Sequence, residues 1–89
     1  MLLLPRPLMH ELAITEGIIK LICDEAEKQG FQKVLGITLA VGDFSGIVPE
    51  CVKDFFPLAA KGSIAEGAEL SFTKSEDQFR CYVEYLTVE

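Results

Sequence analysis

At Gly30 the spacing of apolar residues along the chain changes from the period of a helix to that of a strand. From Leu12 to Gln29 apolar residues recur every three to four positions. Glu11 and Glu16 come early in this segment and Lys28 comes late, which complements a helix dipole. Gly30 then offers the left-handed residue with which helices commonly end. The sequence therefore predicts a helix that stops at Gly30 and is followed by a strand.

The predicted strand runs from Lys33 to Asp43 and alternates with period two, so its two faces differ in bulk. The bulky face, suited to a core, comprises Leu35, Ile37, Leu39 and Val41, and the small face comprises Gly36, Thr38, Ala40 and Gly42. The small face either admits a helix backbone or a second subunit at close range, or faces solvent under thin cover. A second subunit there would make a homodimer.

A second helix is predicted to begin at Pro49 and to end before Gly62. Pro57 lies in its interior, where it deletes the hydrogen bond to the carbonyl of Lys53 and clashes with that group, at a cost of about 3 kcal/mol. We therefore expect this helix to kink or split near Phe56.

Two further strands are predicted, over 68–73 and about 80–88. In a regular strand Val83 would point away from Leu86 and Val88, which indicates a bulge, burial on both faces, or a disturbed register. A strand, helix, strand order implies a right-handed crossover and a parallel pair. The predicted fold class is α+β, with two helices packed on a small three-stranded mixed sheet.

Composition limits the classes of function. The chain has 89 residues, enough for one domain, and its 8 basic and 14 acidic residues give a net charge of −6, which disfavours nucleic acid as a partner. No uninterrupted apolar run reaches the roughly 20 residues of a membrane span. The chain has one histidine, no glycine-rich phosphate loop, and no Cys-His or Ser-His pairing with an arguable geometry, so we expect no enzyme.

The three cysteines are Cys23, Cys51 and Cys81, and no two of them form a Cys-x-x-Cys pair. Neither a disulfide framework nor a tetrahedral zinc site can be completed from them within one chain. A reducing cytoplasm fits this usage best. The apolar run in residues 1–8 is too short for a signal-peptide core and contains two prolines, so we expect it to direct no export.

Three strings occur in collinear order: Met9-His10-Glu11, then Val-Gly-Asp-Phe-Ser-Gly-Ile-Val-Pro-Glu over 41–50, then Lys-Gly-Ser-Ile-Ala-Glu-Gly-Ala over 61–68. Their order and spacing resemble the HypA/HybF family of nickel metallochaperones of nickel–iron hydrogenase maturation, from Met9 to about Phe72. Met-His-Glu alone would carry no weight, because any acidic helix start can contain it. The resemblance implies a HypA-like domain over residues 9–89, preceded by an extension over residues 1–8 that we expect to be disordered.

The resemblance also implies the site and its cargo, Ni(II), which favours square-planar nitrogen ligands. Met9 would give its terminal amine, His10 its ring and amide, and Glu11 its amide with a carboxylate nearby. Family sequences start at this methionine. Either the natural start is Met9, which we favour because residues 1–8 have no evident structural task, or the extension abolishes this site and leaves a weak one on His10. Without the other strings, His10 would be a solvated residue and Glu11 a carboxylate favoured by the helix dipole.

The implied function is delivery of Ni(II) to a maturation GTPase or to the hydrogenase large subunit, with urease maturation as a second setting. The family carries a zinc ribbon of two Cys-x-x-Cys pairs. Phe79-Arg80-Cys81 resembles the segment that leads into the first of these pairs. This chain passes from there to Tyr82–Glu89, which resembles the family's last strand, so we expect no structural zinc. The alternative is a degenerate HypA-like interaction module that keeps the fold and binds no metal.

Overall fold

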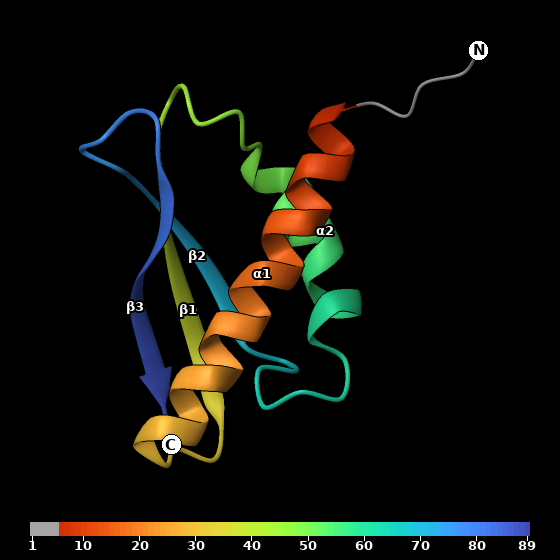
Figure 1. The fold of residues 1–89 in the computed structure, drawn as a ribbon, viewed down its shortest axis with the longest axis vertical. Coiled ribbons are helices and arrows are strands. Elements are labelled where there is room, and N and C mark those ends of the chain that lie inside the picture. The colour runs from red at the N-terminus through yellow and green to blue at the C-terminus, as the bar shows by residue number, and fades with distance from the viewer. Residues whose placement is uncertain (1–5) are drawn as a thin grey trace.

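The chain folds into two helices and one three-stranded sheet. The structure, a computed structural model, describes the backbone of residues 6–89 and the side chains of residues 11–89. The elements follow in the order α1 (Arg6–Gln29), β1 (Val34–Val41), α2 (Pro49–Ala60), β2 (Glu69–Lys74) and β3 (Cys81–Val88) (Figure 1). Of the extension expected to be disordered, residues 6–8 belong to α1, and residues 1–5 lie outside the described residues.

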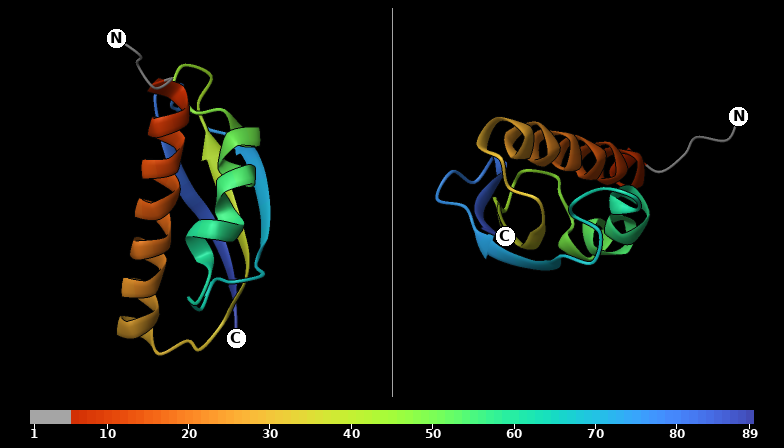
Figure 2. Two further views of the ribbon diagram at one scale, coloured as in Figure 1. Left: turned by 90° about the vertical axis from the view of Figure 1, so that its right-hand side faces the viewer. Right: turned by 90° about the horizontal axis from the view of Figure 1, so that it is seen from below.

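The central strand β1 pairs with β2 in parallel and with β3 in antiparallel, so the strand order is β2-β1-β3. This confirms the α+β class and the mixed sheet. The parallel pair arises because α2 crosses between β1 and β2, as a strand, helix, strand unit requires. Both helices lie on the same side of the sheet (Figure 2). None of the helices in the described part of the chain combines the length and apolar character needed to span a bilayer.

The core fills the space between the sheet and the two helices. Its buried residues are Ile19 and Ile22 from α1, Val34, Ile37, Leu39 and Val41 from β1, and Val52, Phe56 and Ala60 from α2, with Ile47 and Ala65 from the loops. The expected ends of the first helix and of α2 are confirmed, because Gly30 and Gly62 have φ values of 80° and 79°.

One residue of the bulky strand face was wrongly assigned. Leu35 is 43% exposed, whereas Val34 is fully buried. The pairing of β1 with β3 shifts between Val34 and Gly36, so Leu35 is an extra residue in β1 and Val34 takes the core position. A second shift between Thr38 and Leu39 leaves Glu84 as the extra residue in β3, which confirms the bulge among the alternatives for that strand.

Of the expected kink or split in α2 near Phe56, the split is wrong, because α2 runs without interruption from Pro49 to Ala60. Pro57 lies on the exposed side of the helix and near its end, so its ring deletes one hydrogen bond without disturbing the core. Val52, Phe56 and Ala60, at intervals of four residues, bury the other side along the whole helix and hold both halves on the sheet.

Candidate metal centre

The Met-His-Glu motif lies at the N-terminal end of α1, the end at which α2 begins (Figure 1). Met9 and His10 are part of the helical backbone, which starts at Arg6, and their side chains lie outside the described residues. Glu11 is the first residue of the chain whose side chain is described. What the structure adds to the motif therefore comes through Glu11.

The side chain of Glu11 is completely buried. Its Oε2 accepts a hydrogen bond of 2.5 Å from the backbone N–H of Val48, and its own carbonyl oxygen accepts one of 2.6 Å from the hydroxyl of Thr15. Its Oε1 is buried and has no hydrogen-bond partner among the side chains and backbone groups that the structure describes. The carboxylate that we expected near the metal is thus fixed to the next helix by one oxygen.

The start of α2 explains why a carboxylate is found there. The N-cap residue Val48 has an extended backbone (φ −104°, ψ 111°) and no side chain that can cap the helix. In a capping box, a Glu or Gln three residues after the N-cap reaches back to the N-cap N–H, but that place is held by Cys51. Glu11 supplies the missing acceptor from α1, and its negative charge complements the positive end of the α2 dipole.

The loop between β1 and α2 brings Val48 to this position. The hydroxyl of Ser45 donates to the carbonyl of Gly42 at 2.8 Å and accepts the N–H of Ile47 at 3.3 Å, while Gly46 turns the chain with φ 79°. The side chain of Ile47 is buried in the core. These contacts fix the direction from which the chain enters α2, and so they fix the N–H that meets Glu11.

Cys51, in the first turn of α2, is half buried. Desolvation raises the pKa of its thiol, and the carboxylates of Glu11, Asp54 and Glu50 raise it further. A thiol held protonated is a poor ligand for a metal. Across the described residues, no three side chains of His, Cys, Asp or Glu gather as metal ligands.

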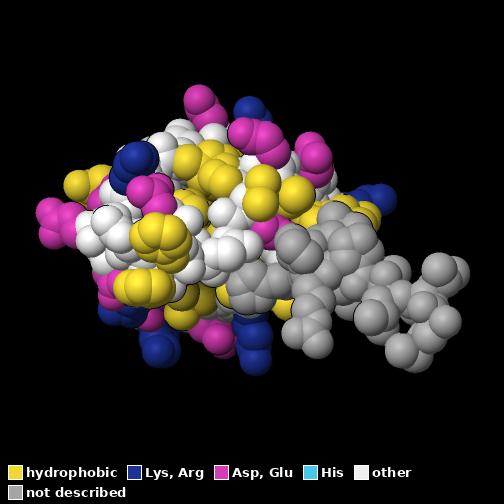
Figure 3. Space-filling view, turned by 90° about the horizontal axis from the view of Figure 1, so that it is seen from above, with side chains coloured by type: hydrophobic (Ala, Val, Ile, Leu, Met, Phe, Trp, Pro, Cys, Tyr) yellow, Lys and Arg dark blue, Asp and Glu magenta, His cyan; other side chains and the backbone are white. Residues whose placement is uncertain are grey.

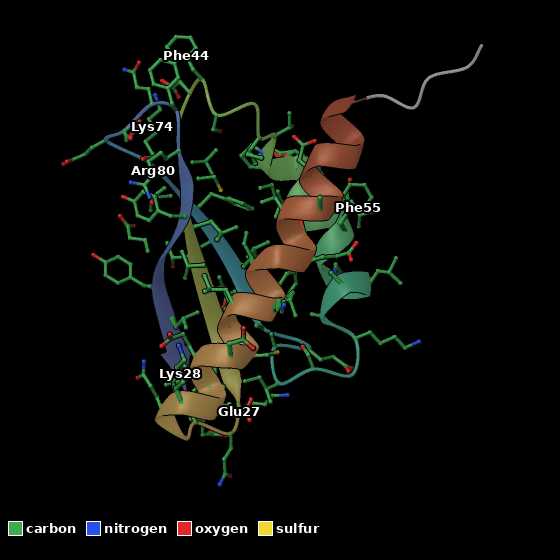
Figure 4. The ribbon with its side chains drawn as sticks, in the orientation of Figure 1. Glu27, Lys28, Phe44, Phe55, Lys74 and Arg80 are labelled. Atoms are coloured by element: carbon green, nitrogen blue, oxygen red, sulfur yellow. The ribbon has the colours of Figure 1, made fainter. Side chains whose placement is uncertain are left out.

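The C-terminal ends of β1 and β2, at the same end of the molecule as the start of α1, lead to an exposed aromatic pair (Figure 1). The rings of Phe44 and Phe79 lie 5.9 Å apart, and these residues are 67% and 74% exposed. Lys74, which lies below Phe44 in Figure 4, forms an ion pair of 3.8 Å with Asp43 at the surface. Hydrophobic side chains on this end of the molecule lie among acidic and basic ones (Figure 3). Asp43, which borders the loop into α2, thus makes an ordinary surface contact.

The sequence interpretation missed the bond between Glu11 and Val48. The local sequence does contain a signal for it, because the helix that starts at Pro49 has Val at its N-cap and Cys at the third helical position. Such a helix needs an acceptor from elsewhere in the chain. Which residue supplies that acceptor depends on the tertiary fold.

Comparison with known proteins assigns the chain to a family. A family model described as hydrogenase/urease nickel incorporation, metallochaperone, hypA matches residues 9–84. The chain is 41% identical over 73 residues to the hydrogenase maturation factor HypA of Caldanaerobacter subterraneus subsp. tengcongensis, covering 82% of this chain and 64% of that protein. It is 40% identical to HypA of Chlorobaculum tepidum and 36% identical to HypA of Thermococcus onnurineus, covering 65% and 52% of those proteins.

The chain belongs to the HypA family. It spans just under two thirds of the length of the first two of these relatives. The family match begins at Met9, the first residue of the Met-His-Glu motif. The resemblance inferred from three short strings is thereby confirmed over most of the chain.

Proposed function

We propose that this chain is a nickel carrier of hydrogenase maturation, which binds one Ni(II) at Met9, His10 and Glu11 and hands it to a partner protein. The observation that carries the proposal is the start of the family match at Met9, in a family described by nickel incorporation. The relatives are named hydrogenase maturation factors, and the proposal includes no catalytic activity. Urease maturation remains a second setting.

The helix geometry supports a form that begins at Met9. In an α-helix each N–H donates to the carbonyl four residues earlier, and the first four N–H groups have no partner within the helix. In the 89-residue chain, α1 starts at Arg6, so carbonyls upstream lie in line for the N–H groups of His10 and Glu11. Without residues 1–8 these two amides belong to the first turn, and Met9 has a terminal amine. Amine, amides and imidazole are nitrogen donors suited to square-planar Ni(II).

The proposed recipients are a maturation GTPase and the hydrogenase large subunit, in the cytoplasm. The net charge of −6 suits a soluble carrier of a cation, because it raises the local concentration of small cations near the surface. The proposal includes no structural zinc.

The test is titration with Ni(II) by calorimetry of three proteins: the form beginning at Met9, the same form with His10→Ala, and the 89-residue chain. We expect one site in the first protein, with at least a hundredfold weaker binding in the other two. Equal and weak affinity of the first two proteins would refute the nickel site.

A second candidate function is an interaction module without a metal role, and the helical backbone of residues 6–8 favours it for the 89-residue chain. There Met9 has a peptide nitrogen within α1 rather than a terminal amine. This candidate predicts that the 89-residue chain competes with a longer HypA relative for a maturation partner while binding no nickel. Failure to compete in a pull-down with purified partner would eliminate it.

A further inference from the structure

The buried carboxylate of Glu11 joins the Met-His-Glu motif to the start of α2. Val48 N–H requires an acceptor, but a glutamate at position 51 would supply one locally, as in a capping box. A buried carboxylate with one oxygen unpaired among the described residues costs free energy relative to an apolar side chain and a local cap. Folding stability alone would be better served by the local arrangement.

From this geometry we infer that Glu11 is the positioning residue of the nickel site: its side chain, anchored on the N–H of Val48, holds the motif end of α1 in place against the start of α2. The inference rests on the proposed function and adds a role for a side chain within it. It assigns the carboxylate to the α2 start, so that the amide of Glu11 and not its carboxylate faces the cargo.

The contacts of Glu11 support this role at three points. Its side chain is fully buried, Oε2 is fixed to α2, and its carbonyl oxygen is fixed by Thr15 one turn further along α1. A residue held at both its side chain and its carbonyl cannot rotate its backbone freely. Because the anchor fixes the start of α1 against the start of α2 before the cargo arrives, it lowers the entropy lost on binding.

The anchor also couples the two ends of the bond. If cargo binding alters the backbone of Glu11, the change must pass through Oε2 to Val48 and the first turn of α2. Coupling of this kind is reciprocal. The amide resonance of Val48 is thus a reporter for cargo binding that lies outside the motif.

The experiment uses the form beginning at Met9 and compares Glu11→Ala, Glu11→Gln and the double variant Glu11→Ala/Cys51→Glu with the parent. Glutamine keeps an oxygen that can accept the Val48 N–H, so it preserves the anchor without the charge. The double variant restores a local acceptor for Val48 without restoring the link to α1. Ni(II) dissociation constants, the absorption spectrum of the bound Ni(II), melting temperatures and the Val48 amide shift are measured for each.

A matched control comes from Glu66, whose carboxylate accepts the N–H of Gly62 at 2.7 Å in the loop after α2. Glu66→Ala removes a carboxylate contact to a backbone N–H of the same kind, away from the motif. We expect it to leave Ni(II) affinity within twofold of the parent. An equal loss of affinity in Glu66→Ala and Glu11→Ala would overturn the inference, because the effect would then follow from general destabilisation.

We expect Glu11→Ala to weaken Ni(II) binding at least tenfold and to alter the spectrum, and Glu11→Gln to retain most of the affinity and a Val48 shift on binding. The double variant should recover the melting temperature and remain weak in binding. The inference is overturned if Glu11→Ala binds as the parent does, if Glu11→Gln is as weak as Glu11→Ala, or if the double variant regains affinity. If the parent itself binds no Ni(II), the proposed function fails; if only the variants depart from expectation, it stands.

Discussion

The carbonyl group of Gln78 lies directly against Gly42, in the place where any other residue would carry its Cβ. The N–H of Gly42 donates to the carbonyl of Arg80 at 2.8 Å, and the N–H of Phe44 donates to the carbonyl of Gln78 at 2.7 Å. The turn between β2 and β3 is thus joined by backbone to the loop that leads from β1 to Val48. The loop that presents Val48 to Glu11 depends on this close approach.

We predict that Gly42→Ala destabilises the protein by about 1–3 kcal/mol, because the new methyl group overlaps backbone atoms that cannot move aside without breaking these hydrogen bonds. Gly17→Ala is the matched control, since a Cβ at Gly17 meets nothing within 4 Å and the residue lies inside α1. That control should gain about 0.5–1 kcal/mol. Urea unfolding measures both, and equal stability of the two variants would contradict the prediction.

Pro57→Ala should stabilise the protein, by up to about 3 kcal/mol, because α2 passes through Pro57 unbroken and alanine restores the hydrogen bond to the carbonyl of Lys53. Pro49→Ala tests the specificity of the effect. Pro49 lies in the first turn of α2, where proline has no N–H to lose, so that variant should gain nothing. Thermal unfolding compares the two variants. A fall in melting temperature for Pro57→Ala would show that contacts of the proline ring stabilise the protein by more than the missing hydrogen bond destabilises it.

Thiol reactivity should depend on pH in a way that reflects the local environment. Burial raises the pKa of Cys81, and desolvation with nearby carboxylates raises that of Cys51. The folded state therefore holds these thiol protons more tightly than the unfolded chain does. Their contribution to stability is present below the ordinary thiol pKa and is lost as pH rises through the raised values.

Alkylation rates followed by mass spectrometry between pH 7 and 10.5 check this prediction. In the folded protein both thiols should become reactive at higher pH than in the urea-unfolded chain. Glu11→Gln should lower the pKa of Cys51 and leave Cys81 unchanged, because only Cys51 is affected by the Glu11 charge. Identical profiles for folded and unfolded protein would refute the assignment.

Purified protein should contain less than one zinc per chain and should melt at the same temperature with and without a chelator. A structural zinc site needs about four ligands. Cys23, Cys51 and Cys81 lie on three separate elements, α1, α2 and β3, and the chain passes from β2 to β3 through residues 75–80. One zinc per chain that is lost together with the fold on chelation would show this expectation to be wrong.

Local patterns predicted those parts of the fold that depend on near neighbours. The period change at Gly30 located the end of α1, and the alternation after it located β1, because both reflect which side of a short segment is buried. The displacement of Leu35 by Val34 was not predictable, since it arises from the register against β3, some fifty residues further along the chain. Continuity of α2 at Pro57 likewise depends on burial of its opposite side against the sheet.

The Met-His-Glu motif was identified by its resemblance to a family, but its contact with the start of α2 was not predicted. Sequence order predicted a helix start around Glu11 and a second helix at Pro49, without indicating that the two meet. The Glu11 side chain was expected either as a carboxylate favoured by the dipole of its own helix or as a carboxylate near the metal. Its complete burial is a tertiary property that requires β1 to bring Val48 alongside α1.

The bond from Glu11 to Val48 joins residues 37 positions apart, with the rest of α1 and all of β1 between them. Contacts of this sequence separation form only after the intervening chain has been ordered, and β1 itself is the middle strand that both other strands must join. A chain emerging from the ribosome therefore exposes Met9 and His10 long before Glu11 has its partner. Under the proposed function, the nickel site would therefore gain its anchor only when synthesis has passed Val48.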